Sequence, residues 1–296
     1  MAITSACCNS SFAHTRLYLC DSFIFRLGTI VNAPFKLIGG KGNRGLNKWV
    51  LSHFPKDYQL YIEPFCGSAA LFYNKEKSPQ SILNDINPDF VEAHLYIKHL
   101  SPTQLNRLER TKHDEATFKN ALERLENPKC KDRGYYTLIR QRMSRSGLGR
   151  TYSASKRQRG GQDEGQNAWD NFVKNVPLYK EKLDKTSLCN YDFSKVFDDY
   201  GVCSEDAQNY FLYVDCPYLE ETRTKNLYEF EFTKQDHIIL AAYLLTTPAK
   251  VLLSGYDSEL YRQIYEHWNF ATLEVANHSG QNSKKERRRE FLWKNY

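Results

Sequence analysis

The chain has 296 residues, of which 41% are hydrophobic and 14% aromatic, so it can bury one sizeable core and carry a smaller insertion around it. Its 41 Lys and Arg against 35 Asp and Glu give a net charge of +6, too small to indicate a nucleic-acid partner by itself. The eight cysteines form no CxxC pair, which argues against a zinc site or a disulfide framework and favours a reducing, intracellular environment.

The first 33 residues do not share the pattern of the rest of the chain. They are apolar, and Arg16, Asp21 and Arg26 interrupt each apolar stretch before it reaches the length of a membrane-spanning helix or a signal-peptide core. We interpret residues 1–33 as an extension of unknown role or as the product of a wrongly assigned translation start. We expect no segment to cross a membrane, and a cytoplasmic location.

From residue 59 onwards, short apolar runs alternate with longer helical patterns. The first half predicts a strand over 59–65, a helix over 68–75, a strand over 81–85 and a helix over 87–100. The second half predicts four more strands and two more helices, the strands at 187–193, 209–215, 250–256 and 270–276 and the helices at 233–247 and 257–268. Such alternation predicts a parallel sheet covered by helices on both faces.

The middle of the chain, residues 101–185, differs in character from both flanks. It is polar, rich in Arg and Lys, and shows helical patterns without a comparable strand run. We therefore predict an α/β fold in which a sheet domain, formed by residues 34–100 and 186–296, is interrupted by a helical insertion over residues 101–185.

Two candidate ligand-binding positions follow the first two predicted strands. The first is the turn Glu63-Pro64-Phe65-Cys66-Gly67-Ser68. Open parallel sheets bind ligands at the carboxyl ends of their strands, and a glycine lets a ligand approach the backbone. The second is Asp85, placed 18 residues after Gly67 and suited to accept hydrogen bonds from ribose hydroxyls. Each motif is weak evidence alone. A glycine at 67 is also expected in an ordinary turn, and polar residues around 85–87 are also expected where Asn87 caps a helix.

The third motif is more informative. The strand predicted over 209–215 leads directly into Asp215-Cys216-Pro217-Tyr218. A carboxylate, a proline-fixed turn and an aromatic ring at a strand end suit a planar ring that bears an amine. Adenine N6 is a poor nucleophile because its lone pair is delocalised, so Asp215 and the carbonyl of Cys216 would accept its two hydrogens. Tyr218 would stack on the base after it is flipped out of the duplex.

With these motifs in this order, the chain resembles the Dam-type, class alpha (D12) adenine-N6 DNA methyltransferases, particularly phage and prophage members. PFKLIGGK (34–41) resembles the family's N-terminal FLKWAGGK element, and EPFCGS resembles its glycine turn. NDIN (84–87) and DCPY follow in the family's order, with a target-recognition insert between them. YLEETR, SGYDSELY and the terminal RREFLWKNY extend the resemblance over residues 34–296.

The resemblance implies a Rossmann-like methyltransferase sheet that uses S-adenosylmethionine, with direct methyl transfer to N6 and neither a metal nor a covalent enzyme intermediate. It implies donor contacts at Leu37, Lys41, Glu63, Phe65, Gly67, Asp85, Asp192, Phe193 and Asp215, of which Asp192 and Phe193 would flank the donor's adenine. It places catalysis at Asp215, Cys216, Pro217 and Tyr218, and a DNA contact at Lys36.

Two residues depart from the family's pattern. Cys216 stands where the turn usually has its first proline, and Leu37 stands where a tryptophan is usual. Cys216 keeps the accepting carbonyl but loses a fixed φ, which Pro217 partly restores by forcing extended geometry on the residue before it. An aliphatic residue at 37 removes a stacking surface, which should weaken donor binding more than it changes the chemistry.

Within the insertion, residues 140–160 contain seven Arg or Lys and no Asp or Glu. Such a loop, interleaved with Gly, Ser and Tyr, suits contact with DNA phosphates and base edges. A solvated basic surface explains an isolated run equally well, but the position between the two halves of the sheet domain favours DNA. We name Arg142, Arg145 and Arg150 as candidates and interpret residues 101–185 as the target-recognition insert.

Rival functions remain open at this point. An adenine methyltransferase acting on RNA, or a related amide methyltransferase, commonly has Asn where Asp215 stands. A catalytically silent relative would bind DNA without modifying it. A cytosine-C5 methyltransferase is disfavoured because its nucleophilic cysteine follows a proline, whereas here Cys216 precedes Pro217. We expect double-stranded DNA as the partner and a monomer without metal. Base contacts depend on loop geometry and DNA shape, so no local motif encodes the recognition sequence, and a restriction endonuclease partner stays open at this point.

Overall fold

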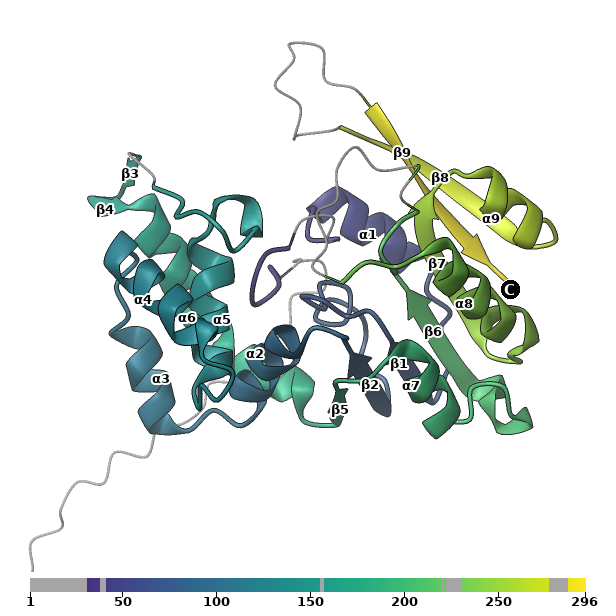
Figure 1. Ribbon diagram of the computed structural model, residues 1–296, viewed down its shortest axis with the longest axis horizontal. Coiled ribbons are helices and arrows are strands. Elements are labelled where there is room, and N and C mark those ends of the chain that lie inside the picture. The colour runs from purple at the N-terminus through teal and green to yellow at the C-terminus, as the bar shows by residue number, and fades with distance from the viewer. Residues whose placement is uncertain (1–30, 38–40, 155–156, 220, 222–229, 277–286) are drawn as a thin grey trace, which may run out of the picture.

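The computed structural model describes residues 31–296 apart from 38–40, 155–156, 220, 222–229 and 277–286 (Figure 1). Nearly all of the N-terminal extension, part of the PFKLIGGK element and half of YLEETR therefore lie outside the described residues. Among the described helices, none is long and apolar enough to cross a membrane.

Seven strands form one mixed sheet in the order β5-β2-β1-β6-β7-β9-β8. The strands are β1 (Leu60–Glu63), β2 (Gln80–Asn84), β5 (Thr186–Cys189), β6 (Tyr210–Val214), β7 (Lys250–Tyr256), β8 (Asn269–Ala276) and β9 (Arg287–Lys294). The first five in the sheet order are parallel, whereas β9 is antiparallel to both β7 and β8. The six predicted strands are confirmed, but the sheet is not wholly parallel because the unpredicted β9 inserts between β7 and β8.

Helices cover both faces of this sheet, as Figure 1 shows. They are α1 (Arg44–Ser52), α2 (Pro88–Lys98), α7 (Phe193–Asp199), α8 (Lys234–Thr246) and α9 (Glu259–Ile264), with a short 3-10 turn η2 (Glu205–Asn209) before β6. Successive strand residues point to opposite faces, so Tyr61 and Ile62 belong to different cores. The core around Tyr61 contains residues of α1 and α2, and the core around Ile62 contains residues of α7, α8 and α9. The prediction of helices on both faces is confirmed.

The chain between α2 and β5 is mainly helical. It forms α3 (Pro102–Glu109), α4 (Glu115–Glu126), α5 (Arg133–Met143), η1 (Arg145–Gly147), the two-residue strands β3 (Gln158–Arg159) and β4 (Gln162–Asp163), and α6 (Glu164–Leu183). Asp89 of α2, 5% exposed, is ion-paired with Arg133 and, at 2.9 Å, with Arg140, both on α5. These ion pairs attach the helical segment to the helix that follows β2.

One predicted helix is wrong. Residues 68–75 form successive turns, although single helix-like hydrogen bonds such as Tyr73 N to Ala69 O (3.1 Å) are present. Both Gly67 (φ +47°) and Ala69 (φ +52°) have left-handed backbone geometry, which a right-handed helix cannot contain. The predicted helix over 87–100 is confirmed, with Asn87 accepting from Asp89 N and Pro88 in the first turn.

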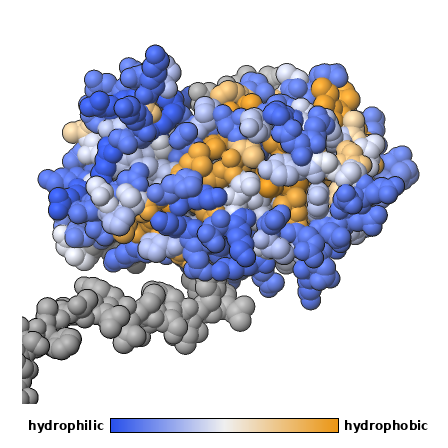
Figure 2. Space-filling view, turned by 90° about the horizontal axis from the view of Figure 1, so that it is seen from below, coloured by the Kyte–Doolittle hydropathy of each residue, from blue (hydrophilic) through white to orange (hydrophobic). Residues whose placement is uncertain are grey.

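Exposed hydrophobic residues are unevenly distributed over the surface. On the face seen from below in Figure 2, hydrophobic residues gather in the middle of the molecule, between hydrophilic surfaces on either side. The large apolar side chains that are exposed include Ile86, Leu148 and Phe230, and all three line the cavity described next.

Candidate active site

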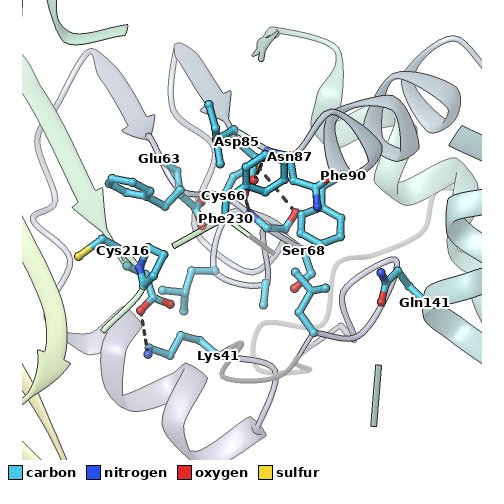
Figure 3. A pocket seen from close by; sticks show the side chains of 18 of the residues that line it. Lys41, Glu63, Cys66, Ser68, Asp85, Asn87, Phe90, Gln141, Cys216 and Phe230 are labelled. Carbon is cyan, nitrogen blue, oxygen red and sulfur yellow. Dashed lines mark hydrogen bonds and ion pairs between the residues drawn. The ribbon is translucent and has the colours of Figure 1, made fainter. Parts of the chain in front are cut away.

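Three carboxylates lie at the carboxyl ends of three neighbouring strands. Glu63 is the last residue of β1, Asp85 follows the last residue of β2, and Asp215 follows the last residue of β6. Because β2, β1 and β6 are parallel neighbours, their carboxyl ends meet at the same edge of the sheet. All three carboxylates line one cavity of about 400 Å³ (Figure 3).

The cavity brings together most of the residues that the sequence analysis singled out. The donor and catalytic candidates that line it are Leu37, Lys41, Glu63, Phe65, Gly67, Asp85, Asp215, Cys216, Pro217 and Tyr218. Residues of the helical segment line it as well, namely Arg140, Gln141, Leu148, Gly149 and Arg150. The site is therefore formed by both the sheet and the segment between α2 and β5. Of the predicted residues, Lys36, Arg142, Arg145, Asp192 and Phe193 do not line it.

The turn after β1 holds the first part of the site. Gly67 N donates to Asp85 Oδ2 at 2.7 Å, and Asn87 N donates to Asp85 Oδ1 at 2.9 Å. A Cβ added at Gly67 would lie 2.8 Å from Leu37 Cδ1, so only glycine leaves this space open. Burial raises the pKa of Asp85 to about 6, although the two backbone donors oppose the shift. Asp85 is therefore ionised at neutral pH.

Glu63 is buried in the floor between the other two carboxylates. Its Oε2 accepts a hydrogen bond from Tyr61 Oη at 2.8 Å. Burial raises the pKa of Glu63 to about 8, and the neighbouring Asp215 adds to the rise. At neutral pH this side chain is mostly protonated, so it adds little negative charge to this edge of the sheet.

Asp215 belongs to a buried cluster of charged and hydroxyl groups. Lys41 Nζ lies 3.0 Å from Asp215 Oδ1 and 2.7 Å from Glu290 Oε1. Tyr218 Oη lies 2.5 Å from Glu290 Oε1 and 3.2 Å from Asp215 Oδ1. Burial lowers the pKa of Lys41, but the carboxylates of Asp215 and Glu290 outweigh it and raise the pKa overall. Burial raises the pKa of Asp215, and Lys41 opposes that rise.

Glu290, on β9, is the residue of this cluster that the sequence analysis missed. It is 3% exposed and lies within the RREFLWK segment, where it precedes three buried hydrophobic residues. A charged residue at a buried position of an apolar run is a signal, because such a charge needs a partner. Its partner, Lys41, lies 249 residues earlier in the chain, so the sequence alone does not reveal the pair.

Cys216 turns its side chain away from the charged cluster. Its Sγ lies 3.5 Å from Tyr261 Oη and 3.9 Å from His237 Nδ1, and Figure 3 shows the sulfur on the side of the turn away from Lys41. Burial raises the pKa of the thiol to about 12. A thiol that stays protonated at neutral pH is a poor nucleophile, which argues against a nucleophilic role for the Cys216 side chain.

Asp192 and Phe193 lie at the start of α7, as its N-cap and its first residue. Asp192 caps the helix by accepting from Ser194 N at 2.9 Å. The ring of Phe193 is buried and lies 5.6 Å from the ring of Phe65, which does line the cavity. Phe193 therefore supports a lining residue from behind.

The predicted DNA contacts divide into two groups. Arg142 donates to Pro34 O at 2.7 Å and to Ala168 O at 2.8 Å, which ties α5 to α6 and to the start of the described chain. Lys36, Arg145 and Arg150 are exposed. Lys36 and η1 are adjacent, because a Cβ added at Gly147 would lie 2.4 Å from Lys36 O.

A seven-stranded sheet in this order, with helices on both faces and carboxylates at the ends of its parallel strands, has the Rossmann-like fold of methyltransferases. Residues 38–279 match the D12 class N6 adenine-specific DNA methyltransferase family, and the chain belongs to it. The chain is also similar to the Type II methyltransferase M1.LlaDCHI of Lactococcus lactis subsp. cremoris. The two are 27% identical over 270 residues, which cover 84% of this chain and 90% of the relative.

Family membership confirms the resemblance and the adenine-N6 DNA methylation that it implies. The chain is an adenine-specific DNA methyltransferase that methylates N6, and methyltransferases of this family use S-adenosylmethionine. Among the residues that the structure describes, no group of three or more His, Cys, Asp or Glu side chains is arranged to hold a metal ion.

Proposed function

We propose that the cavity holds S-adenosylmethionine and a flipped adenine side by side, and that the enzyme methylates N6 of adenine in duplex DNA. One observation carries this proposal. The carboxylates of Asp85 and Asp215 line one cavity from the ends of β2 and β6, and the basic helical segment lines the same cavity. One carboxylate is thus available to the methyl donor and the other to the base.

The residues near Asp85 fit the donor. Gly67 leaves a space beside Leu37 that any side chain at 67 would fill, and Asp85 is a half-buried carboxylate suited to ribose hydroxyls. Phe65 and Leu37 add apolar surface for the donor. When bound, S-adenosylmethionine supplies a methyl group on a cationic sulfur. The negative charges at the strand ends complement that cation and hold it close to the base.

The residues near Asp215 fit the base. Asp215 accepts a hydrogen bond from one N6–H group, and the carbonyl of Cys216 accepts a hydrogen bond from the other. These two bonds orient the nitrogen lone pair toward the methyl group. Pro217 fixes the turn, and the ring of Tyr218 provides an aromatic surface beside it. Transfer would form the bond from the methyl carbon to N6 and break its bond to the donor's sulfur, and Asp215 would take up the proton that the nitrogen loses. The Asp215 carboxylate is 18% exposed, so a base in the cavity can reach it.

We assign DNA binding to the helical segment, residues 101–185, with Lys36 contributing from the sheet domain. Arg145 and Arg150 are exposed, and Arg150 also lines the cavity, so it links the DNA surface to the base. Arg142 is engaged with two backbone carbonyls and acts in positioning α5. We further propose that the enzyme acts as a monomer, which sedimentation of the free protein and of its DNA complex would test.

The function is tested by transfer of a labelled methyl group from S-adenosylmethionine to duplex DNA, single-stranded DNA and RNA. The proposal expects label in the duplex, at N6 of adenine. Label only in RNA would replace the proposed substrate, and DNA binding without label would identify a silent relative. Sequencing of host DNA after expression would report activity, target base and recognition sequence together.

A further inference from the structure

Glu290 is placed to influence the active site without entering the cavity. Its Oε1 lies 2.7 Å from Lys41 Nζ, 2.5 Å from Tyr218 Oη and 2.9 Å from Ser254 Oγ. Three donors from three segments thus converge on one buried oxygen. Glu290 is not among the residues that line the cavity, whereas Lys41 and Tyr218 are. Glu290 can therefore affect a ligand through its contacts with these two side chains and through the effect of its charge on Asp215.

Lys41 is shared between two carboxylates. One ammonium group cannot neutralise both Asp215 and Glu290, so the three side chains carry a net charge of −1 when both acids are ionised. Both polar contacts that the Asp215 carboxylate makes to described residues, with Lys41 Nζ and with Tyr218 Oη, use Oδ1. The second oxygen, Oδ2, is thereby left for a ligand in the cavity that Asp215 lines.

We propose that Glu290 is a positioning residue for methyl transfer, which draws part of the Lys41 charge away from Asp215 and anchors the Tyr218 hydroxyl, so that Asp215 remains a strong acceptor for the adenine amine. The proposal rests on the function assigned to Asp215 above. Without the Glu290 charge, Lys41 would pair with Asp215 alone. A carboxylate that is more fully neutralised accepts a weaker hydrogen bond from a neutral amine.

The charges of the cluster determine in which direction the pKa of Asp215 should shift when the Glu290 charge is removed. The titratable groups that interact electrostatically with Asp215 are Lys41, Glu63, Tyr213, Cys216, Tyr218, Tyr261 and Glu290. Burial raises the pKa of Asp215, Lys41 lowers it and Glu290 raises it. Removal of the Glu290 charge should therefore lower the pKa of Asp215. A residue that only braces the fold would not shift this pKa in a fixed direction.

The test compares wild type with Glu290→Gln, which keeps the size and one acceptor oxygen but removes the charge. Two measurements are needed: the pKa of Asp215 from its ¹³C carboxyl resonance in the free protein, assigned with Asp215→Asn, and the pH profile of kcat for methyl transfer to duplex DNA. We expect a lower Asp215 pKa, an acid limb of kcat moved to lower pH, and a kcat reduced about tenfold or more at neutral pH. KM for DNA should change less than about twofold.

The matched control is Glu274→Gln, because Glu274 is an exposed glutamate of β8 that pairs with Arg289 at the surface. It should change neither the Asp215 pKa nor kcat. An unchanged Asp215 pKa in Glu290→Gln would overturn the proposal, even if kcat fell. If Glu290→Gln does not fold, Glu290→Asp must show a smaller shift in the same direction. Should wild type transfer no methyl group to DNA, the proposed function fails, while the resonance measurement still decides the role of Glu290.

Discussion

Asp85 and Asp215 lie on opposite sides of β1, each one residue beyond the end of its strand, and both carboxylates line the same cavity. A methyl donor held by Asp85 and an amine held by Asp215 would therefore meet above the end of β1, where Glu63 forms the floor. This relationship gives a physical reason for the order of motifs along the chain, because each motif follows the strand that positions it.

The Gly67 turn should be sensitive to a single added methyl group. Gly67→Ala forces a side chain into left-handed geometry and places its Cβ 2.8 Å from Leu37 Cδ1. We expect a loss of about 1–2 kcal/mol in the free energy of unfolding and weaker donor binding. Urea unfolding and calorimetric titration with S-adenosylmethionine measure the two effects. Gly42→Ala is the matched control, because an added Cβ there meets nothing within 4 Å.

Glu63 should make the stability of the free protein depend on pH. Its pKa is raised from 4.5 to about 8, so the protonated form is the one that stabilises the fold. The associated stability is fully present below about pH 4.5 and is lost as the pH rises through 8. Glu63→Gln removes this titration. Between about pH 4.5 and 8, the free energy of unfolding of the variant minus that of wild type should therefore rise with pH, by about 1.4 kcal/mol or less per pH unit. If the free energy of unfolding, measured in urea, changes with pH at the same rate in Glu63→Gln and in wild type, the raised pKa of Glu63 is contradicted.

Arg145 should contribute to DNA affinity through charge. Charge reversal, Arg145→Glu, should weaken binding and reduce the slope of log K against log salt by about one unit or more. Lys195→Glu, on α7, makes the same change of charge at an exposed lysine outside the helical segment, and should leave the slope nearly unchanged. Fluorescence anisotropy with a labelled duplex at several salt concentrations measures both. An unaltered slope for Arg145→Glu would remove it from the DNA surface.

Cys216 should be replaceable by proline. The thiol contacts Tyr261 and His237 rather than the charged cluster, and the proposed contribution to catalysis is a backbone carbonyl that proline retains. Cys216→Pro should therefore keep or raise kcat, since a fixed φ restrains the turn. A large loss of kcat in a folded variant would show that the thiol has a role of its own.

Much of the sheet domain could be predicted from the sequence, because apolar runs that alternate with helical patterns are local signals. The predicted strands correspond to β1, β2, β5, β6, β7 and β8, and Asp85 and Asp215 follow their strands as expected. The strand β9 was missed because it begins with three arginines and is defined by pairing with β7 and β8. The helix predicted over 68–75 was wrong because the backbone at Ala69 is left-handed. Alanine favours helices, so the sequence gives no sign of this geometry.

Side-chain roles were harder to predict than strands. Lys41 was expected to contact the donor, and the structure shows it shared between Asp215 and Glu290 in the wall of the cavity. Arg142 was expected to contact DNA, and the structure shows its guanidinium donating to two backbone carbonyls. In both cases the deciding partner lies far away in the sequence, so composition and spacing carry no information about it.

The most direct test is methyl transfer to duplex DNA by Asp215→Ala, measured in single turnover beside DNA affinity. Loss of the acceptor for the adenine amine should reduce transfer by about a thousandfold or more while the affinity for DNA remains nearly that of wild type. Transfer by Asp215→Ala at the wild-type rate would contradict the account, because the amine would then be held by some other group.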